Sequence, residues 1–120
     1  MKVAVVTEPY KVDFQEFPVP EVKAEDILIK TFRAGICGSD LHLYKGLHAF
    51  RKLPASLGHE ISGIVEKVGA GVTHFKVGDR VTVEPQIGCG HCEFCKCGNV
   101  NLCINKSVPG TPGWLVSGRS

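Results

Sequence analysis

Four cysteines near the end of the chain are spaced so that one metal ion can hold them together, and this spacing most constrains the fold. They are Cys89, Cys92, Cys95 and Cys103. A gap of two residues lets neighbouring thiolates bind the same ion, and Zn²⁺ favours four sulfurs at the corners of a tetrahedron. We therefore predict a closed zinc site that fixes residues 86–104, here called the cysteine lobe, and leaves no ligand position for water.

Two other side chains in the cysteine lobe could compete for this metal. Cys97 is separated from Cys95 by one residue, and the spacing predicts that it is a spare thiol. His91 is predicted to face solvent. An iron–sulfur cluster is the chemical alternative, because bacterial ferredoxins also space cysteines by two residues. Their last gap is shorter and a proline follows the final cysteine, whereas Ile104 follows Cys103 here, so zinc is favoured.

A second set of ligand-type residues lies upstream, in the segments Gly35–His42 and Gly58–Glu60. A zinc ion that takes part in chemistry needs about three protein ligands and one open position. Cys37, His59 and Glu60 can supply a sulfur, a nitrogen and an oxygen. Taken alone, a cysteine or a histidine is usually a core residue. The flanking residues favour a second, open metal site.

Three neighbours of these ligands suit supporting roles. Asp40 can accept the far ring N–H of His59 and so fix its tautomer. Ser39 and His42 can pass a proton from a zinc-bound alcohol to solvent. We therefore predict that Ser39, His42 and Asp40 belong to the catalytic site.

Most of the chain reads as short strands joined by Gly and Pro turns, which predicts a mainly β fold, an irregular barrel with short helices. The expected strands are Lys2–Thr7, Lys11–Phe17, Asp26–Arg33, Ile61–Val68 and Asp79–Glu84. One helix is expected to begin near Ser39, capped by Ser39 or Asp40, and to end at Gly46. Residues 107–120 are rich in Gly, Pro and Ser and are expected to form a poorly ordered tail.

The composition excludes several classes of function. The 14 Lys and Arg residues are scattered, so no nucleic-acid partner is expected. No apolar run reaches the length of a membrane span or a signal peptide, so we predict no membrane partner and a cytoplasmic location. A secreted module with three disulfides is the alternative, but five of the six cysteines crowd into residues 89–103. Gly69 and Gly71 lack the third glycine of a dinucleotide fingerprint and predict a turn.

At these motifs the sequence resembles the zinc-dependent medium-chain alcohol dehydrogenase family, in its N-terminal GroES-like catalytic domain. The matching segments are Gly35–His42, Gly58–Glu60, Val77–Val81 and Cys89–Cys103. The amino-acid sequence of these segments is most similar to that of the polyol, butanediol and threonine dehydrogenase branch. The resemblance implies a GroES-like β-barrel over residues 1–106, with residues 107–120 outside the family pattern.

The resemblance also implies roles for single residues. Cys37 and His59 match the ligands of a catalytic zinc, and Glu60 matches the glutamate that binds this metal or swings in during turnover. Ser39 matches the hydroxyl that takes the alcohol proton, and His42 the base at the end of the proton relay. The four cysteines of the cysteine lobe match the ligands of a structural zinc.

The implied reaction is zinc-assisted hydride transfer between an alcohol, or the matching ketone or aldehyde, and NAD(P). Family members bind NAD(P) in a Rossmann domain that this chain lacks, so we expect the chain alone to be inactive. Unpaired strand edges and exposed apolar surface would favour self-association, and we expect a homo-oligomer. A non-enzymatic zinc-binding or GroES-like interaction module is the alternative. Such a module has no need of an open metal site at Cys37, His59 and Glu60.

Overall fold

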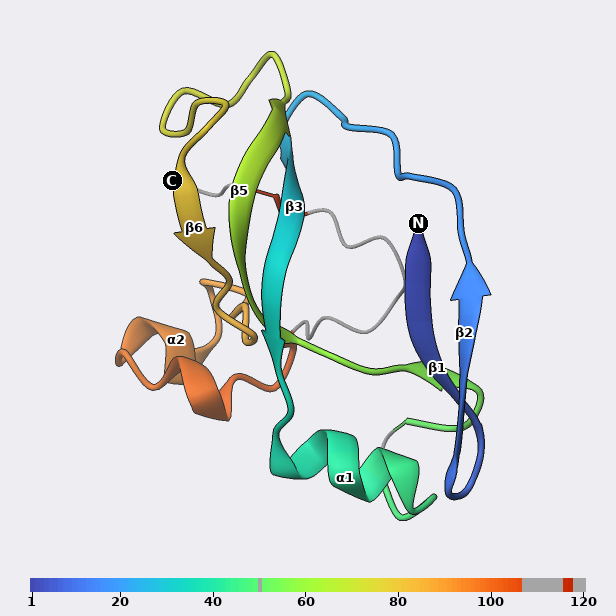
Figure 1. The fold of residues 1–120 in the computed structure, drawn as a ribbon. Helices are drawn as coiled ribbons and strands as arrows, with labels where there is room; N and C mark the ends of the chain where they lie inside the picture. Colours follow the sequence, from blue (N-terminus) through green and yellow to red (C-terminus); the bar gives the residue numbers. More distant parts are fainter. Residues whose placement is uncertain (50, 107–115, 118–120) are drawn as a thin grey trace.

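Two antiparallel sheets carry most of the regular structure in this computed structural model, which describes residues 1–49, 51–106, 116 and 117 (Figure 1). The first sheet has the strand order β2-β1-β4 and the second the order β6-β5-β3-β7. The strands are β1 (Lys2–Glu8), β2 (Lys11–Glu16), β3 (Asp26–Gly35), β4 (Ala55–Ser56), β5 (Glu60–Val68), β6 (Arg80–Thr82) and β7 (Val116–Ser117). The mainly β fold predicted from the sequence is confirmed.

Strand β1 lies in the middle of the first sheet, which explains its apolar, β-branched sequence. Val5 and Val6 are consecutive and therefore point to opposite faces of the strand, yet both are buried, so both faces of β1 are covered at this point. The hairpin to β2 turns at Tyr10, whose φ is 66°. The Tyr10 N–H donates to the carbonyl of Tyr44 over 2.7 Å, and the two rings pack edge to face at 5.5 Å. These contacts attach the first sheet to helix α1 (Gly38–Tyr44).

The long antiparallel pairing of β3 with β5 brings the upstream motifs together. Its register runs from Ile27 opposite Val68 to Gly35 opposite Glu60. Cys37 follows the last residue of β3 by two positions, and His59 directly precedes β5. Segments more than twenty residues apart in the chain therefore meet at one end of the strand pair, beside α1 (Figure 1).

Helix α1 forms where the sequence predicts it, but its N-cap residue differs from the predicted one. The N-cap is Cys37, rather than Ser39 or Asp40, and its sulfur accepts the backbone N–H of Ser39. Asp40 in turn accepts the Cys37 backbone N–H over 3.1 Å, the reciprocal arrangement of a capping box. Leu43, 1% exposed, anchors the helix in the core. The helix ends before Gly46, whose φ of 72° favours glycine.

The cysteine lobe contains two short helices that the sequence did not predict. They are α2 (Glu93–Lys96) and the 3₁₀ helix η1 (Val100–Leu102). Both are too short to show an apolar period, so only the folded lobe reveals them. None of the helices in the described residues is long and apolar enough to span a membrane.

The tail predicted to be poorly ordered lies outside the described residues, apart from positions 116 and 117. These two pair with Asp26 and Ile27 of β3 as strand β7. The tail therefore contributes at least this one pairing to the second sheet.

Candidate functional site

The four predicted cysteines of the lobe converge on one point. The sulfurs of Cys89, Cys92, Cys95 and Cys103 all lie within 4.8 Å of one another. The sulfurs of Cys92 and Cys103 are 3.8 Å apart. Two thiolates on a tetrahedral zinc with Zn–S bonds of about 2.3 Å are separated by about 3.8 Å, so this donor set fits zinc.

Glycines allow the lobe to close around these sulfurs. A Cβ atom on Gly88 would lie 2.9 Å from the sulfur of Cys95 and 2.7 Å from Cγ1 of Val100. Gly90 and Gly98 have φ values of 78° and 80°, a conformation that other residues rarely adopt. The lobe therefore needs its glycines as well as its cysteines.

The two possible competitors stay outside this group of sulfurs. Cys97 is exposed and is not among the four clustered cysteines. His91 is also exposed, and its Nδ1 lies 2.8 Å from the carbonyl oxygen of Cys89. Both side chains lie as the sequence reasoning expects.

The pKa values of three thiols in the lobe are shifted from the ordinary value, two downward and one upward. The backbone N–H of Cys95 is the main cause that lowers the pKa of Cys92 to about 6. Backbone N–H groups, first that of His91, also lower the pKa of Cys89. The N–H of Gly90 lowers the pKa of Cys95, but burial and the neighbouring thiols outweigh it and raise this pKa to about 12. Four thiolates this close together require a cation.

We predict that zinc binding by the lobe releases protons and weakens on acidification. At pH 7 Cys95 carries a proton that it must lose to bind a metal, because its pKa is about 12. Each released proton makes the affinity fall about tenfold for every pH unit of acidification. Calorimetry at pH 7 in two buffers of different ionisation enthalpy measures the number released. Equal binding heats in both buffers would contradict the prediction.

The upstream motifs form a second cluster at the end of β3 and β5. The Cys37 sulfur lies 3.1 Å from Nε2 of His59 and 2.8 Å from the Ser39 hydroxyl, which is itself 3.4 Å from the same Nε2. Zinc bound to both Cys37 and His59 would set S and N about 3.5 Å apart, so a small opening of this pair admits the ion. A soft sulfur and an imidazole nitrogen are donors that suit zinc.

Asp40 organises this cluster from the protein side. Its carboxylate, only 3% exposed, accepts the backbone N–H groups of Cys37 at 3.1 Å and Gly58 at 3.3 Å. Its Oδ1 also lies 3.4 Å from Nδ1 of His59, which leaves Nε2 directed at Cys37. The predicted neighbourhood of Asp40 and His59 is present. Because Asp40 touches both segments, it links the two motifs directly.

Of the other predicted site residues, Ser39 contacts this cluster, whereas Glu60 and His42 lie outside it. Cys37, Asp40 and His59 each place a ligand atom within 4.8 Å of the others, and Glu60 is not part of this group. The Glu60 carboxylate lies over Gly35 instead. His42 is exposed on α1, and its imidazole makes no hydrogen bond to any residue that the structure describes. The Ser39 hydroxyl is therefore in contact with the cluster, and His42 is not.

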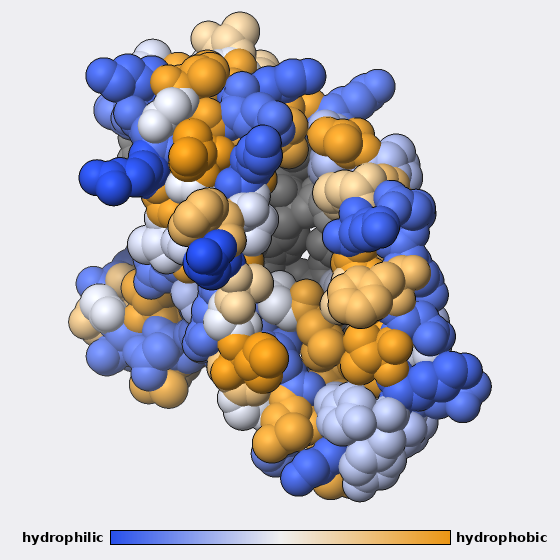
Figure 2. Space-filling view, in the orientation of Figure 1, coloured by the Kyte–Doolittle hydropathy of each residue, from blue (hydrophilic) through white to orange (hydrophobic). Residues whose placement is uncertain are grey.

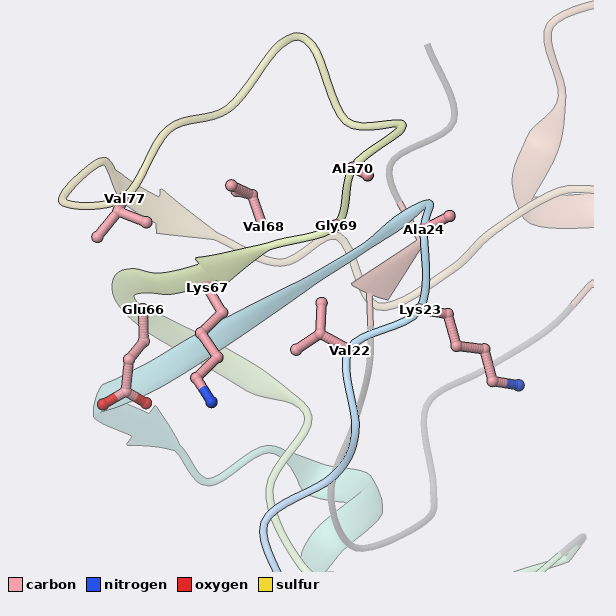
Figure 3. Close-up of a pocket in the computed structure, with 9 residues that line it drawn as sticks. All are labelled: Val22, Lys23, Ala24, Glu66, Lys67, Val68, Gly69, Ala70 and Val77. Carbon is pink, nitrogen blue, oxygen red and sulfur yellow. The ribbon is translucent and has the colours of Figure 1, made fainter.

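Among the pockets formed by the described residues, two that border the paired strands differ in position. A pocket of about 390 Å³ borders the cluster and is lined mainly by apolar groups, with Asp40 at its wall and Leu41 and Tyr44 from α1. Another, of about 600 Å³, lies at the opposite end of β3 and β5; residues 22–24 line one side of it, and Val77 lies on the other side (Figure 3). The second pocket contains none of the predicted site residues.

The sequence motifs contain Gly35 and Gly58, but their roles in shaping the cluster were not predicted. Gly58 has a φ of 89° and donates its N–H to Asp40, which turns the chain so that His59 reaches Cys37. Gly35 faces the carboxylate of Glu60. The available signal was that each candidate ligand segment begins with a glycine.

Comparisons with known proteins agree with this geometry. The family model of the alcohol dehydrogenase GroES-like domain matches residues 23–118. Sorbitol dehydrogenase of Bacillus subtilis (strain 168) is 45% identical over 116 residues, which are 93% of this chain and 33% of that protein.

Solved structures of longer proteins contain the same fold. Galactitol-1-phosphate dehydrogenase from Escherichia coli superposes with a TM-score of 0.84 at 33% identity, over 92% of this chain and 32% of that one. A putative zinc-binding dehydrogenase from Sinorhizobium meliloti 1021, bound to NADP, has a TM-score of 0.77 at 37% identity, over 91% and 32%. The chain thus spans about a third of the length of these relatives. With the motifs, the fold and the matched range in agreement, the chain belongs to the family of alcohol dehydrogenase GroES-like domains.

Proposed function

We propose that this chain is the zinc-binding catalytic domain of an NAD(P)-dependent alcohol or polyol dehydrogenase. The observation that supports this most strongly is the contact between the Cys37 sulfur and Nε2 of His59 at the end of β3 and β5. The buried Asp40 contacts the other ring nitrogen of His59. The names of the relatives, a sorbitol dehydrogenase and a galactitol-1-phosphate dehydrogenase, support a small polyol as the substrate, converted to a ketone or aldehyde. The NADP in the Sinorhizobium structure supports a nicotinamide cofactor.

In this proposal, Cys37 and His59 would hold the catalytic zinc, with Glu60 as the third protein ligand when its side chain is rotated toward them. When bound there, zinc would supply Lewis-acid polarisation of the substrate oxygen. Asp40 fixes the orientation of the imidazole through Nδ1. Ser39 accepts the alcohol proton, supported by the position of its hydroxyl 2.8 Å from the Cys37 sulfur. His42 receives that proton once its imidazole turns toward Ser39.

The four cysteines of the lobe have a structural role in this proposal. They would hold a second zinc with four thiolate ligands, which would leave no coordination position for substrate. No residue of this chain is assigned to the nicotinamide cofactor. Hydride transfer therefore requires a nicotinamide-binding part beyond the residues described here, and the chain alone is expected to be inactive.

The proposal includes association between copies and a cytoplasmic location. Several large apolar side chains are exposed, among them Ile36 at 89% and Phe32 at 66%. Apolar residues are visible on the face shown in Figure 2. Exposed apolar surface of this kind favours contact with another chain. All six cysteines are free thiols, as expected in a reducing compartment.

Metal content tests the proposal. We expect about two zinc ions per chain, falling to about one in Cys37→Ser, because one closed and one open site are present. Elemental analysis for zinc and iron measures this, and Cys97→Ser, a change of the exposed thiol outside both clusters, should keep both ions. One zinc in the wild type and in Cys37→Ser alike would favour a non-enzymatic zinc module. Iron in place of zinc would contradict the dehydrogenase assignment.

A further inference from the structure

The C-terminal end of helix α1 is completed by a residue from another element. The last four carbonyls of a helix find no partner within the helix itself. Three of the last carbonyls of α1 accept N–H groups from residues 45–47. The carbonyl of Tyr44, the last helical residue, instead accepts the N–H of Tyr10 in the β1–β2 turn over 2.7 Å (Figure 1). The turn therefore holds the far end of a helix whose N-cap is Cys37.

Tyr10 holds this position in a backbone conformation that does not suit it. Its φ of 66° lies in the left-handed region, where a bulky residue is a rare exception. Its ring packs edge to face on that of Tyr44, with the ring centroids 5.5 Å apart. The preceding Pro9 lies against the residues that follow the helix, since a Cβ atom on Gly46 would be 2.9 Å from its Cγ. A glycine would adopt this φ without strain, so the Tyr10 ring contributes a contact that the turn itself does not require.

The same hairpin also holds the segment that leads to His59. Strand β1 pairs with β4, and the carbonyl of Ala4 in β1 accepts the N–H of Leu57 over 3.0 Å. Asp40 joins the two ligand segments at the cluster itself, and the hairpin joins them from the far side. A helix of seven residues is too short to keep its position alone. The placement of Cys37 relative to His59 therefore depends on the hairpin as well as on Asp40.

We propose that Tyr10 is a positioning residue for the metal site and acts through α1. Its ring and its N–H hold the C-terminal end of the helix, and so set the angle at which the helix presents Cys37 and Ser39 to His59. This inference rests on the proposed function. Without the ring, α1 can tilt about the hydrogen bond that joins its N-cap to Asp40. The metal would then be bound more weakly and with a different geometry, although every ligand is still present.

The test compares three variants of the β1–β2 hairpin. Tyr10→Gly removes the ring, keeps the N–H and suits the φ of the turn. Tyr10→Phe keeps the ring and is the conservative variant. Phe14→Ala is the matched control, because it removes an aromatic ring from β2 that is 77% exposed.

Three readouts separate positioning from general stability. Competition with a chelator gives the zinc affinity of the binding step that Cys37→Ser removes. The visible absorption spectrum of the chain fully loaded with Co²⁺, minus that of the same variant carrying Cys37→Ser, reports the geometry of this site alone. Amide hydrogen exchange of the metal-free chain reports how firmly α1 is held. A loss of stability alone would lower the affinity without changing the spectrum of the loaded site.

We expect Tyr10→Gly to lower the zinc affinity of this step roughly fivefold, less than the 10- to 100-fold loss typical of direct partners of metal ligands. Its Co²⁺ difference spectrum should shift, and amide exchange in α1 should be faster. Tyr10→Phe and Phe14→Ala should match the wild type in all three readouts. A wild-type affinity or a wild-type Co²⁺ spectrum in Tyr10→Gly would overturn the inference alone. If Cys37→Ser removed no metal-binding step from the wild-type chain, the proposed function would fall and the inference with it.

Discussion

Asp40→Ala is expected to cause the largest loss at the upstream cluster, in stability and in metal binding together. The buried carboxylate accepts the N–H groups of Cys37 and Gly58 and lies 3.4 Å from the His59 ring. Its removal leaves two backbone donors without their acceptor, which costs about 3 kcal/mol in the free energy of unfolding. Zinc affinity at the cluster should fall roughly 10- to 100-fold, since the histidine loses its orienting partner.

Urea unfolding and chelator competition measure these two effects. Asp40→Asn, which keeps one carbonyl acceptor, should fall between Asp40→Ala and the wild type. Asp79→Asn is the matched control, because Asp79 also accepts a backbone N–H, that of Lys76, but in an exposed loop. We expect that control to cost less than about 1 kcal/mol. A stable Asp40→Ala chain with undiminished zinc affinity would show that the two motifs hold together without this carboxylate.

Gly69→Ala is expected to destabilise the whole second sheet. A Cβ atom there would lie 2.0 Å from the carbonyl oxygen of Lys23 and 2.4 Å from that of Ala24. Both are backbone atoms, so the crossing segment itself would have to move (Figure 3). The Gly69 N–H also donates to the carbonyl of Asp26 over 2.8 Å, and this hydrogen bond would be strained.

Overpacking of this kind costs about 3 kcal/mol. For a domain of this size, that cost lowers the melting temperature by roughly 10 °C. Thermal unfolding followed by circular dichroism measures the shift, and Gly38→Ala, with open space around the new methyl group, should melt within a few degrees of the wild type. If Gly69→Ala melted at the same temperature as this control, the backbone of residues 22–24 would be able to shift without loss of stability, and the prediction would be wrong.

Local sequence was enough to predict the cysteine lobe and most of the strands. A metal ligand set with gaps of two residues is a local property, so Cys89, Cys92 and Cys95 could be assigned without knowing the fold. The alternation and β-branched content of the strand segments are local too. The cap of α1 was wrongly assigned because a cysteine sulfur is an unusual N-cap, and only the geometry shows it accepting from Ser39.

The upstream cluster depended on tertiary structure. Cys37 and His59 are ligand-type residues in the sequence, but only the register of β3 against β5 brings them to one end of the strand pair. Three further contacts join atoms that are far apart in the chain. Glu60 lies over Gly35, Asp40 accepts hydrogen bonds from both ligand segments, and the backbone of Lys23 and Ala24 leaves no room for a side chain at Gly69. Residue types and short spacings therefore determined which chemistry is possible here. Long-range strand pairing decided which of those groups meet, because distances between distant segments are set only when the sheet forms.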